Sequence, residues 1–494
     1  MRRAKTGRNG KAIEPSSDAP ERMRLTLDRH SRTPFYRQIY QRFRDAIAQG
    51  ILRPGERLPS ARSLASQLAT SRGTVDLAYD LLSGEGHILT QGAAGTIVAP
   101  ELAAALKPHA SLRNVSKPAL PEPGVGELVA RPFQMGLPAL DAFPWKLWSR
   151  LTIRHARALA IREMNAPSAT GYLPLREAVR SYLAVSRGIL CSTDNLIITA
   201  GFQGALGLIT RALLHPGDEV WFEDPGYFVA RLGLEAAGAK IVAVPVDADG
   251  LNVEAGIAKS PRARFAFVTP SHQAPLGVSL SPARRLALLS WAAKSKSWII
   301  EDDYDSEFRY GSRPLPALKS LDEADRVIYV GTLSKVLFPG LRLGYVVVPE
   351  SALDRVNRIC RLLYRDLPIF SQEIVVDFMT EGHFARHIRR MRSLYSSRRS
   401  ALAAALVKVF GSQITIQLEA GGMHLLARLA NCKSDLDFVA RAEAEGLAPA
   451  ALSPWSLRRD CGQGLLLNFT NVRQETAFEM ATRLKQAISA NRRP

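Results

Sequence analysis

Short runs of apolar residues recur between helical stretches from about residue 131 onward, and each has the length of a β-strand. The runs are apolar throughout and do not alternate with polar residues, which is typical of strands buried on both faces of a mostly parallel sheet covered by helices. The sequence therefore predicts an α/β body with a smaller α+β subdomain at its end. The predicted strands are Leu196–Thr199, Glu219–Phe222, Ile241–Val244, Phe265–Thr269, Trp298–Ile300, Val327–Val330 and Tyr345–Val348.

The chain has 494 residues, which is too long for one hydrophobic core, so we expect a multidomain protein. Residues 1–30 are polar and basic, which indicates a disordered basic arm. Residues 31–100 form a compact helical pattern that ends in a short strand pair. Residues 101–130 hold four prolines among small residues, as linkers do. Residues 131–494 make up the α/β body.

The sequence predicts neither a signal peptide, nor a membrane span, nor a metal site. The N-terminus lacks the apolar segment of a signal peptide, and no apolar run reaches the roughly 20 residues that span a bilayer. The four cysteines, Cys191, Cys360, Cys432 and Cys461, have neither C-x-x-C nor metal-ligand spacing. We therefore expect reduced thiols, no metal site, no membrane contact and a cytoplasmic location.

The net charge of +19 suggests a polyanionic partner, although charge alone does not separate nucleic acid from an anionic membrane. Residues 1–100 carry 16 Lys and Arg against 9 Asp and Glu. The excess of basic residues therefore extends well beyond residues 1–100.

Apolar residues at helical spacing predict three short helices in residues 31–100, the second capped by Ser60 and the third by Ser71. A tight turn at Ala69–Thr70 joins the last two, as in a helix-turn-helix whose second helix enters the major groove. The segment after it, with the glycine-rich tip Gly92–Gly95, predicts a two-stranded wing. The residues expected to face inward are Phe35, Ile39, Phe43, Ile47, Leu64, Leu68, Val75, Tyr79 and Leu82.

We call residues 31–100 the head of the chain. Three stretches of the head, residues 36–39, 50–62 and 71–75, resemble the winged helix of GntR-type repressors in order and spacing. The alternative is a three-helix protein-interaction module, against which the arginines gathered in so small a unit argue. The resemblance implies double-stranded DNA as the partner, and it implies contacts to phosphates or bases from Arg57, Ser60, Arg62, Arg72 and Thr74, with a wing contact at Gly95.

The stretch Gly331–Lys335, followed by Pro339–Gly344, suits a phosphate-bearing aldehyde. A lysine amine forms a Schiff base with an aldehyde carbon, while hydroxyls and a guanidinium bind phosphate oxygens. Upstream, Asp302 follows a predicted strand, where open parallel sheets bind ligands, and its carboxylate can pair with a protonated pyridine nitrogen. Polar or aromatic groups also follow other predicted strands, in the segments 199–203, 224–227 and 270–277.

These segments together resemble the fold type I, pyridoxal-phosphate-dependent aminotransferases over residues 131–494, and the whole chain resembles the MocR-type members of the GntR regulators. The resemblance implies pyridoxal 5'-phosphate as cofactor, Lys335 as the Schiff-base lysine and Asp302 as the pyridine partner. Tyr227 is expected to stack on the ring. Tyr304 and either His272 or Gln273 lie near its phenolic oxygen. The residues expected at the phosphate are Phe202, Gln203, Thr332, Ser334 and Arg342.

One departure from the aminotransferase pattern bears on the ligand. These enzymes carry an arginine on a late strand that holds the substrate carboxylate, but the corresponding segment, Gly464–Phe469, has none. Arg458 and Arg459 lie just upstream. The missing arginine argues against a standard α-amino acid as substrate and favours another amine, or the cofactor itself, as effector.

The leading hypothesis is a transcription regulator that binds DNA through its head and senses an amine, an amino acid or pyridoxal phosphate through an aldimine at Lys335. The resemblance further implies a domain-swapped homodimer. One alternative is a working aminotransferase with a DNA-binding appendage, and another is a DNA-binding protein whose body has lost its cofactor. The basic segment Arg386–Arg399 is either a solvated helix face with structural ion pairs or a second DNA-contacting surface.

Overall fold

The computed structural model describes residues 26–29, 31, 33–92, 95–102, 129–158, 168–310, 316–363, 367–430, 432–458 and 461–489. Contacts divide the chain into two compact units, Met1–Pro121 and Glu122–Pro494. Most of the predicted basic arm and most of the predicted linker lie outside the described residues, so both remain predictions.

The first unit contains three helices followed by an antiparallel strand pair, as the sequence predicts. Ser60 Oγ accepts a hydrogen bond from Ser63 N at 3.1 Å, and Ser71 Oγ accepts one from Thr74 N at 3.2 Å, so both predicted caps are present. The turn between the last two helices places Ala69 at a positive φ of 49°. The elements are α2 (Phe35–Ala48), α3 (Ala61–Gln67), α4 (Arg72–Gly84), β1 (Ile88–Thr90) and β2 (Thr96–Val98).

The apolar faces of these three helices form one small core. Phe43 lies at its centre with no exposed surface, and its ring meets that of Tyr79 edge-on at 5.7 Å between centroids. Of the residues expected to face inward, Phe35 and Leu68 are half-buried and the others are buried.

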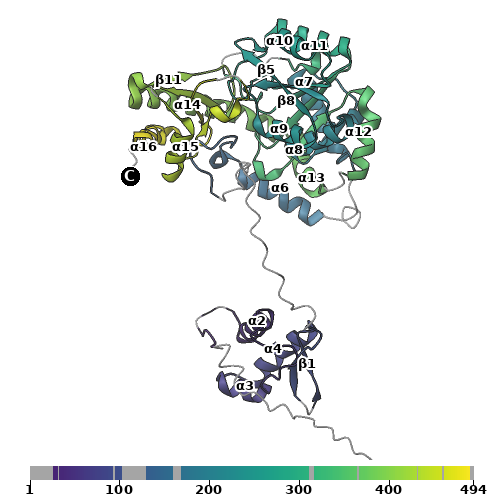
Figure 1. Cartoon of the computed structure of the whole chain (residues 1–494), viewed down its shortest axis with the longest axis vertical. Coiled ribbons are helices and arrows are strands. Elements are labelled where there is room, and N and C mark those ends of the chain that lie inside the picture. The colour runs from purple at the N-terminus through teal and green to yellow at the C-terminus, as the bar shows by residue number, and fades with distance from the viewer. Residues whose placement is uncertain are drawn as a thin grey trace, which may run out of the picture. The chain divides into compact units, whose positions relative to one another are not determined.

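The second unit is built on an eight-stranded sheet with the order β3-β10-β9-β8-β7-β4-β5-β6. Figure 1 labels two of its strands, β5 and β8, among the helices that cover the sheet. The neighbouring strands from β9 to β5 are parallel, whereas β10 runs antiparallel to both of its neighbours and β6 runs antiparallel to β5. The predicted, mostly parallel sheet is therefore confirmed. The strands are β3 (Leu196–Thr199), β4 (Glu219–Asp224), β5 (Lys240–Asp247), β6 (Gly250–Leu251), β7 (Phe265–Val268), β8 (Trp298–Asp303), β9 (Val327–Thr332) and β10 (Gly344–Val347).

Successive side chains of these strands lie on opposite faces of the sheet, and each face packs into its own hydrophobic core. Both faces are therefore buried, which explains why the runs are apolar throughout. On β8, Trp298 and Ile300 pack with helices α8, α9 and α12, while Ile299 packs on the other face with α10 and α11. Helices α7, α13 and α14 (His383–Phe410) complete the cover. The helices of this layer are α6 (Trp145–Ala158), α7 (Leu173–Arg187), α8 (Gly201–Leu213), α9 (Phe228–Ala236), α10 (Val253–Lys259), α11 (Pro282–Ser295), α12 (Glu350–Leu363) and α13 (Ile369–Thr380).

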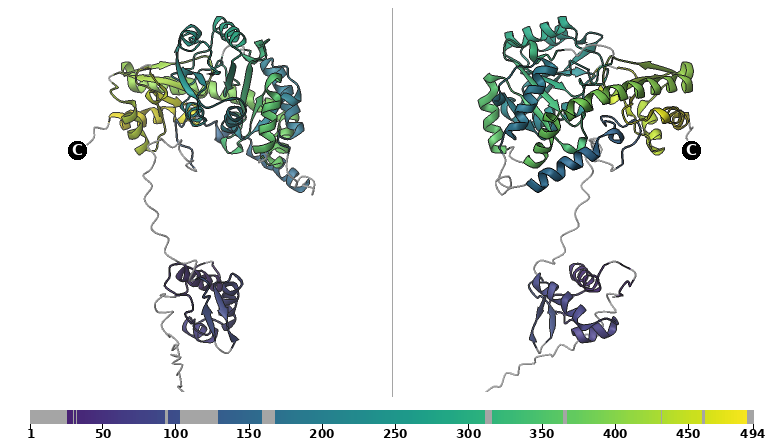
Figure 2. Two further views of the ribbon diagram at one scale, coloured as in Figure 1. Left: turned by 45° about the vertical axis from the view of Figure 1, so that its right-hand side comes forward. Right: turned by 180° about the vertical axis from the view of Figure 1, so that it is seen from behind.

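The C-terminal part forms the smaller α+β subdomain that the sequence predicts, with an antiparallel sheet of order β11-β12-β14-β13. Figure 2 shows the long helix α14 leading from the large sheet layer to this subdomain. Its elements are α14 (His383–Phe410), β11 (Ile414–Gln417), β12 (His424–Leu429), α15 (Asp435–Ala444), β13 (Ala450–Ala451), β14 (Leu465–Asn468) and α16 (Ala477–Ser489).

The described part of the chain contains no helix that is both long and apolar enough to cross a membrane. It also contains no group of three His, Cys, Asp or Glu side chains arranged to hold a metal ion. Within the described residues, none of the four cysteines forms a disulfide bond.

Candidate cofactor and DNA-binding sites

Lys335 follows the end of β9, and its Nζ donates a hydrogen bond of 3.0 Å to the carbonyl oxygen of Gly136. Burial lowers the pKa of the amine, and the nearby carboxylates of Asp305 and Asp302 only partly oppose this shift. A lowered pKa increases the fraction of uncharged amine, which is the nucleophilic form.

Gly136 is a functional position that the sequence reasoning missed. Its φ is +74°, which favours glycine, and a Cβ built on it would lie 2.2 Å from the Nζ of Lys335, so a side chain here would displace the lysine amine from its present position. Asn468 on β14 donates to the carbonyl oxygens of Gln134 and Leu137 at 2.7 and 2.9 Å. The loop 134–137, which contacts the amine of Lys335, is therefore held to the C-terminal subdomain.

Asp302 lies within β8, because this strand continues past Ile300, where the sequence prediction ended it, to Asp303. Its side chain is 5% exposed and makes no hydrogen bond to the described residues. Burial raises the pKa of the carboxyl well above its usual range, Asp303 adds to the shift, and Lys335 opposes it. A buried carboxylate without a donor is unfavourable, and the protonated nitrogen of a pyridine ring would supply that donor.

His272 and Gln273, which the sequence left as alternatives, occupy different surroundings. His272 Nδ1 lies 3.0 Å from the hydroxyl of Tyr304 and 3.1 Å from Oδ2 of Asp305. Gln273 is buried, and its amide donates to the carbonyl oxygens of Pro225 and Ala274 at 2.8 Å. The imidazole therefore lies beside Tyr304, whereas the glutamine holds two loops together.

Asp305 and His424 are further members of this cluster that the sequence reasoning did not identify. The rings of His272 and His424 lie 5.4 Å apart, and a Cβ on Gly422 would lie 2.0 Å from His272 Cε1. His424 Nε2 lies 3.0 Å from the carbonyl oxygen of Pro275. Burial lowers the pKa of His424 to about 4, with a further contribution from His272.

This depressed pKa predicts a pH-dependent stability. An unfolded histidine has a pKa of about 6.5, so unfolding takes up a proton between that pH and pH 4. The contribution of neutral His424 is complete above pH 6.5 and declines as the pH falls toward 4. From pH 7.5 to 5, the parent should lose on the order of 2 kcal/mol more free energy of unfolding than His424→Gln, because glutamine keeps a donor but does not titrate.

Urea denaturation followed by tryptophan fluorescence at the two pH values measures this difference. His215→Gln is the matched control, because the side chain of His215 is 75% exposed. If His424→Gln lost as much stability as the parent, the burial of a neutral imidazole would be disproved.

The residues expected at the phosphate lie around the start of α8. Arg342 donates to Gln203 Oε1 at 3.2 Å, and Ser334 N donates to Thr332 Oγ1 at 3.2 Å. Gly344 brings β10 so close to the start of α8 that a Cβ there would lie 3.0 Å from Gly201 Cα. A helix N-terminus with hydroxyls and a guanidinium beside it is a donor set that suits a phosphate.

Aromatic side chains line the site next to these groups. The ring of Tyr227 lies 5.7 Å from that of Phe202 and 5.8 Å from that of Trp455, which comes from the C-terminal subdomain and was not predicted. Burial, and next the charge of Asp302, raise the pKa of Tyr227 to about 12. The phenol is therefore neutral at physiological pH and offers a planar face.

The segment that lacks the aminotransferase arginine forms β14, and Leu466 on it packs with Ala274, Leu426 and Trp455 beside Tyr227. Arg458 is exposed, and its backbone N–H donates to Asp224 at 3.0 Å. Arg459 lies outside the described residues. The face that meets Tyr227 is thus lined by leucine and tryptophan.

In the first unit, the residues expected to contact DNA lie around α3, α4 and the wing. Arg62 is exposed, and Arg72 is exposed with an ion pair of 3.3 Å to Asp76 on its own helix. Ser60 caps α3, and Thr74 Oγ1 lies 2.8 Å from the Oγ of the capping Ser71. The backbone of Arg57 forms an antiparallel β-bridge with Ile97 of the wing. A Cβ on Gly95 would lie 3.1 Å from the guanidinium of Arg57.

Comparison with known families agrees with the division of the chain into a DNA-binding unit and an α/β unit. The model of the family described as bacterial regulatory proteins, gntR family, matches residues 35–98, and that of aminotransferase class I and II matches residues 151–447. The probable rhizopine catabolism regulatory protein MocR of Rhizobium meliloti is 36% identical over 476 residues, which cover 94% of this chain and 96% of the relative. This chain belongs to the MocR-type regulators of the GntR family.

Other relatives and solved structures agree with this assignment. The pyridoxine biosynthesis regulator PdxR of Corynebacterium glutamicum is 31% identical to this MocR-type chain over 94% of it and 98% of the relative. The kynurenine aminotransferase of Pyrococcus horikoshii, solved with PMP, has a TM-score of 0.66 and 29% identity over 72% of this chain and 90% of its own. The expected cofactor, pyridoxal 5'-phosphate, and the expected fold are therefore confirmed.

Proposed function

We propose that this MocR-type regulator binds double-stranded DNA through its first unit and changes its DNA affinity when a small amine, or pyridoxal phosphate itself, reacts or binds at Lys335. The buried amine of Lys335, with its lowered pKa beside the unpartnered carboxylate of Asp302, is the observation that carries the proposal. Pyridoxal phosphate, when bound, supplies an aldehyde carbon open to amines and a ring that withdraws electrons.

The residues of the site have different roles in this proposal, toward the ring, the aldehyde carbon and the phosphate of the cofactor. Asp302 would hold a proton on the pyridine nitrogen, Tyr227 would pack on the ring, and Tyr304 with His272 would bind near the phenolic oxygen. Lys335 supplies the amine. The groups proposed for the phosphate are the backbone N–H groups of Phe202 and Gln203 with the side chains of Gln203, Thr332, Ser334 and Arg342.

We further propose that the protein acts in the cytoplasm as a domain-swapped homodimer, with residues 101–130 as the exchanging linker. Two heads related by a two-fold axis match two half-sites about one helical turn of DNA apart. The prolines of the linker support an extended connection. Sedimentation equilibrium of the full chain measures the mass, and a monomer at micromolar concentration would contradict the dimer.

A combined titration tests the proposed function. DNA from the region upstream of the gene is titrated with the protein in the presence of free pyridoxal phosphate and of a panel of amines, while the visible spectrum of the cofactor is recorded. We expect one ligand to change both the spectrum and the DNA affinity. Sustained conversion of an amino donor and a keto acceptor, with unchanged DNA affinity, would instead support the aminotransferase alternative.

The DNA interface gives a separate prediction. Arg72→Ala removes an exposed guanidinium from the first turn of α4, and we expect DNA affinity to fall roughly 10-fold or more, because one base or phosphate contact contributes about 1–3 kcal/mol. The control is Arg180→Ala, an exposed arginine on α7 of the body. Fluorescence anisotropy at several salt concentrations measures affinity and its salt dependence. Equal affinity of Arg72→Ala and parent would contradict the assigned recognition helix.

A further inference from the structure

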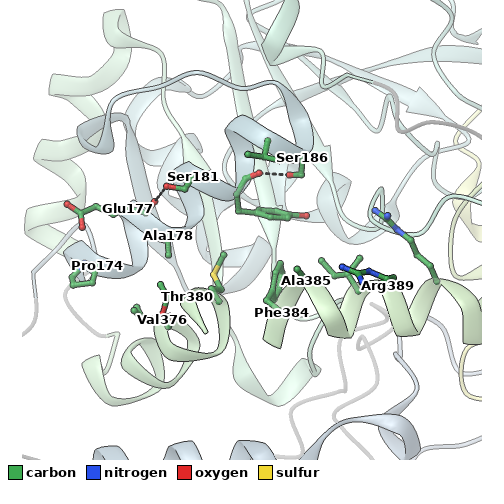
Figure 3. A pocket seen from close by; sticks show the side chains of 15 residues that line it. Pro174, Glu177, Ala178, Ser181, Ser186, Val376, Thr380, Phe384, Ala385 and Arg389 are labelled. Atoms are coloured by element: carbon green, nitrogen blue, oxygen red, sulfur yellow. Dashed lines mark hydrogen bonds between the residues drawn. The ribbon is translucent and has the colours of Figure 1, made fainter. Parts of the chain in front are cut away.

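A groove of about 740 Å³ lies on the body between α7, α13 and α14, where none of the proposed cofactor ligands lies (Figure 3). This volume falls within the range of small-molecule sites, which is roughly 300–1,000 Å³. Its middle is apolar, with Ala178, Met379 and Phe384 among its lining residues. The rings of Tyr182 and Phe384 meet edge-on there, at 5.2 Å between centroids.

The two ends of the groove differ in charge. Glu177 and Arg389 lie at opposite ends in Figure 3, and Arg392 joins Arg389 one turn further along α14. Arg389 is exposed and makes no ion pair or hydrogen bond with the described residues. Arg392 is half-buried, and its Nε donates to the carbonyl oxygen of Glu307, which fixes the guanidinium beside the groove.

We propose that this groove binds a small amphipathic carboxylate, with its apolar body along Met379 and Phe384 and its anionic group between Arg389 and Arg392. Charge-assisted bonds from two guanidinium groups favour a carboxylate over a neutral group of the same shape. The site is separate from Lys335, so it adds a second ligand to the regulator and does not depend on which amine the cofactor site accepts.

A row of buried contacts links the groove to the cofactor site. The hydroxyl of Tyr182 donates to Glu307 Oε1 at 2.7 Å. The guanidinium of Arg187 lies 3.4 Å from the same oxygen and 3.0 Å from Oδ2 of Asp303, the neighbour of Asp302 on β8. A ligand that displaces the ring of Tyr182 would therefore disturb these contacts and, through Asp303, the end of β8 that carries Asp302.

Isothermal titration of the cofactor-loaded full chain with 4-phenylbutyrate tests the site, with uncharged 4-phenylbutyramide as the matched probe. We expect the carboxylate to bind at least 10-fold more tightly than the amide and Arg389→Gln to lose that preference. Arg390→Gln, an exposed neighbour that does not line the groove, should bind as the parent does. Equal affinities for the two probes, no saturable binding at millimolar concentration, or an unaffected Arg389→Gln would each overturn the proposal.

Two further variants test what occupies the groove and whether it is linked to the cofactor. Ala178→Phe fills the groove and should abolish probe binding while the sedimentation mass stays the same; a changed mass would assign the groove to contact between copies and overturn the ligand site. Binding of 4-phenylbutyrate should shift the visible band of the cofactor in the parent. Tyr182→Phe should keep probe binding but lose that shift, and a parent without any shift would disprove the link.

Discussion

Lys335→Ala is expected to abolish covalent attachment of pyridoxal phosphate and, with it, every response of the protein to amines. Nζ of Lys335 lies beside Gly136, and its pKa is lowered by burial close to the carboxylate of Asp302. Exposed lysines have amines that are almost entirely protonated at neutral pH and are poor nucleophiles. We therefore expect the loss to be complete.

The visible spectrum after borohydride reduction, and the mass of the reduced protein, measure covalent attachment directly. Lys240→Ala is the matched control, because Lys240 is an exposed lysine of the same unit and should leave the spectrum as in the parent. DNA affinity without ligand should also remain, because the head lies in the other compact unit. A Lys335→Ala protein that still showed the cofactor mass and answered amines as before would disprove the assigned lysine.

Local patterns predicted the positions of most strands of the large sheet and the exact bounds of β3, but they ended β4 and β8 too early. The expected strand at Trp298–Ile300 continues as β8 through Asp303, because β9 pairs with these polar residues as it does with the apolar ones. The acidic residues of this strand are tolerated because Asp302 lies close enough to Lys335 for their charges to interact, while Asp303 accepts a hydrogen bond of 2.6 Å from Tyr329. A count of apolar residues cannot detect partners that come from other strands.

The same limit applies to the site. Lys335, Asp302 and Tyr304 follow predicted strands, so the sequence alone indicated that these three side chains lie close together at one edge of the sheet. Gly136, His424 and Trp455 reach the site from distant segments, and nothing in their own neighbourhoods marks them. Asp305 carried a signal, the run of carboxylates from Asp302 to Asp305, but only the contact with His272 gives it a role.

The head was predicted more completely because its structure rests on local signals. Both predicted capping serines accept hydrogen bonds at the start of their helices, and the apolar spacing of each helix corresponds to one buried face. The wing strands pair over the short connection Thr90–Thr96. Short-range order of this kind can be read from the sequence without knowledge of the rest of the fold.

Phe43→Ala is expected to unfold this head and to lower DNA affinity at least 100-fold while leaving the body intact. Phe43 has no exposed surface and packs on Tyr79, and truncation of a buried phenylalanine destabilises by about 3–5 kcal/mol. A unit of this size is stable by only about 3–10 kcal/mol, so the loss is comparable to its whole stability. Leu77→Ala on α4 is the control for stability, since Leu77 is 46% exposed and its truncation should leave the helical signal of the head nearly unchanged.

The positions of the tryptophans make this outcome easy to separate. All six lie after residue 140, so tryptophan fluorescence reports the body alone, whereas far-ultraviolet circular dichroism also reports the helices of the head. Phe43→Ala should show reduced helical signal, unchanged tryptophan denaturation and an unchanged cofactor spectrum, because the two units have separate cores. If the body lost its cofactor or its denaturation midpoint together with the head, the two units would fold as one, and a ligand at Lys335 could not act by shifting a balance between independent parts.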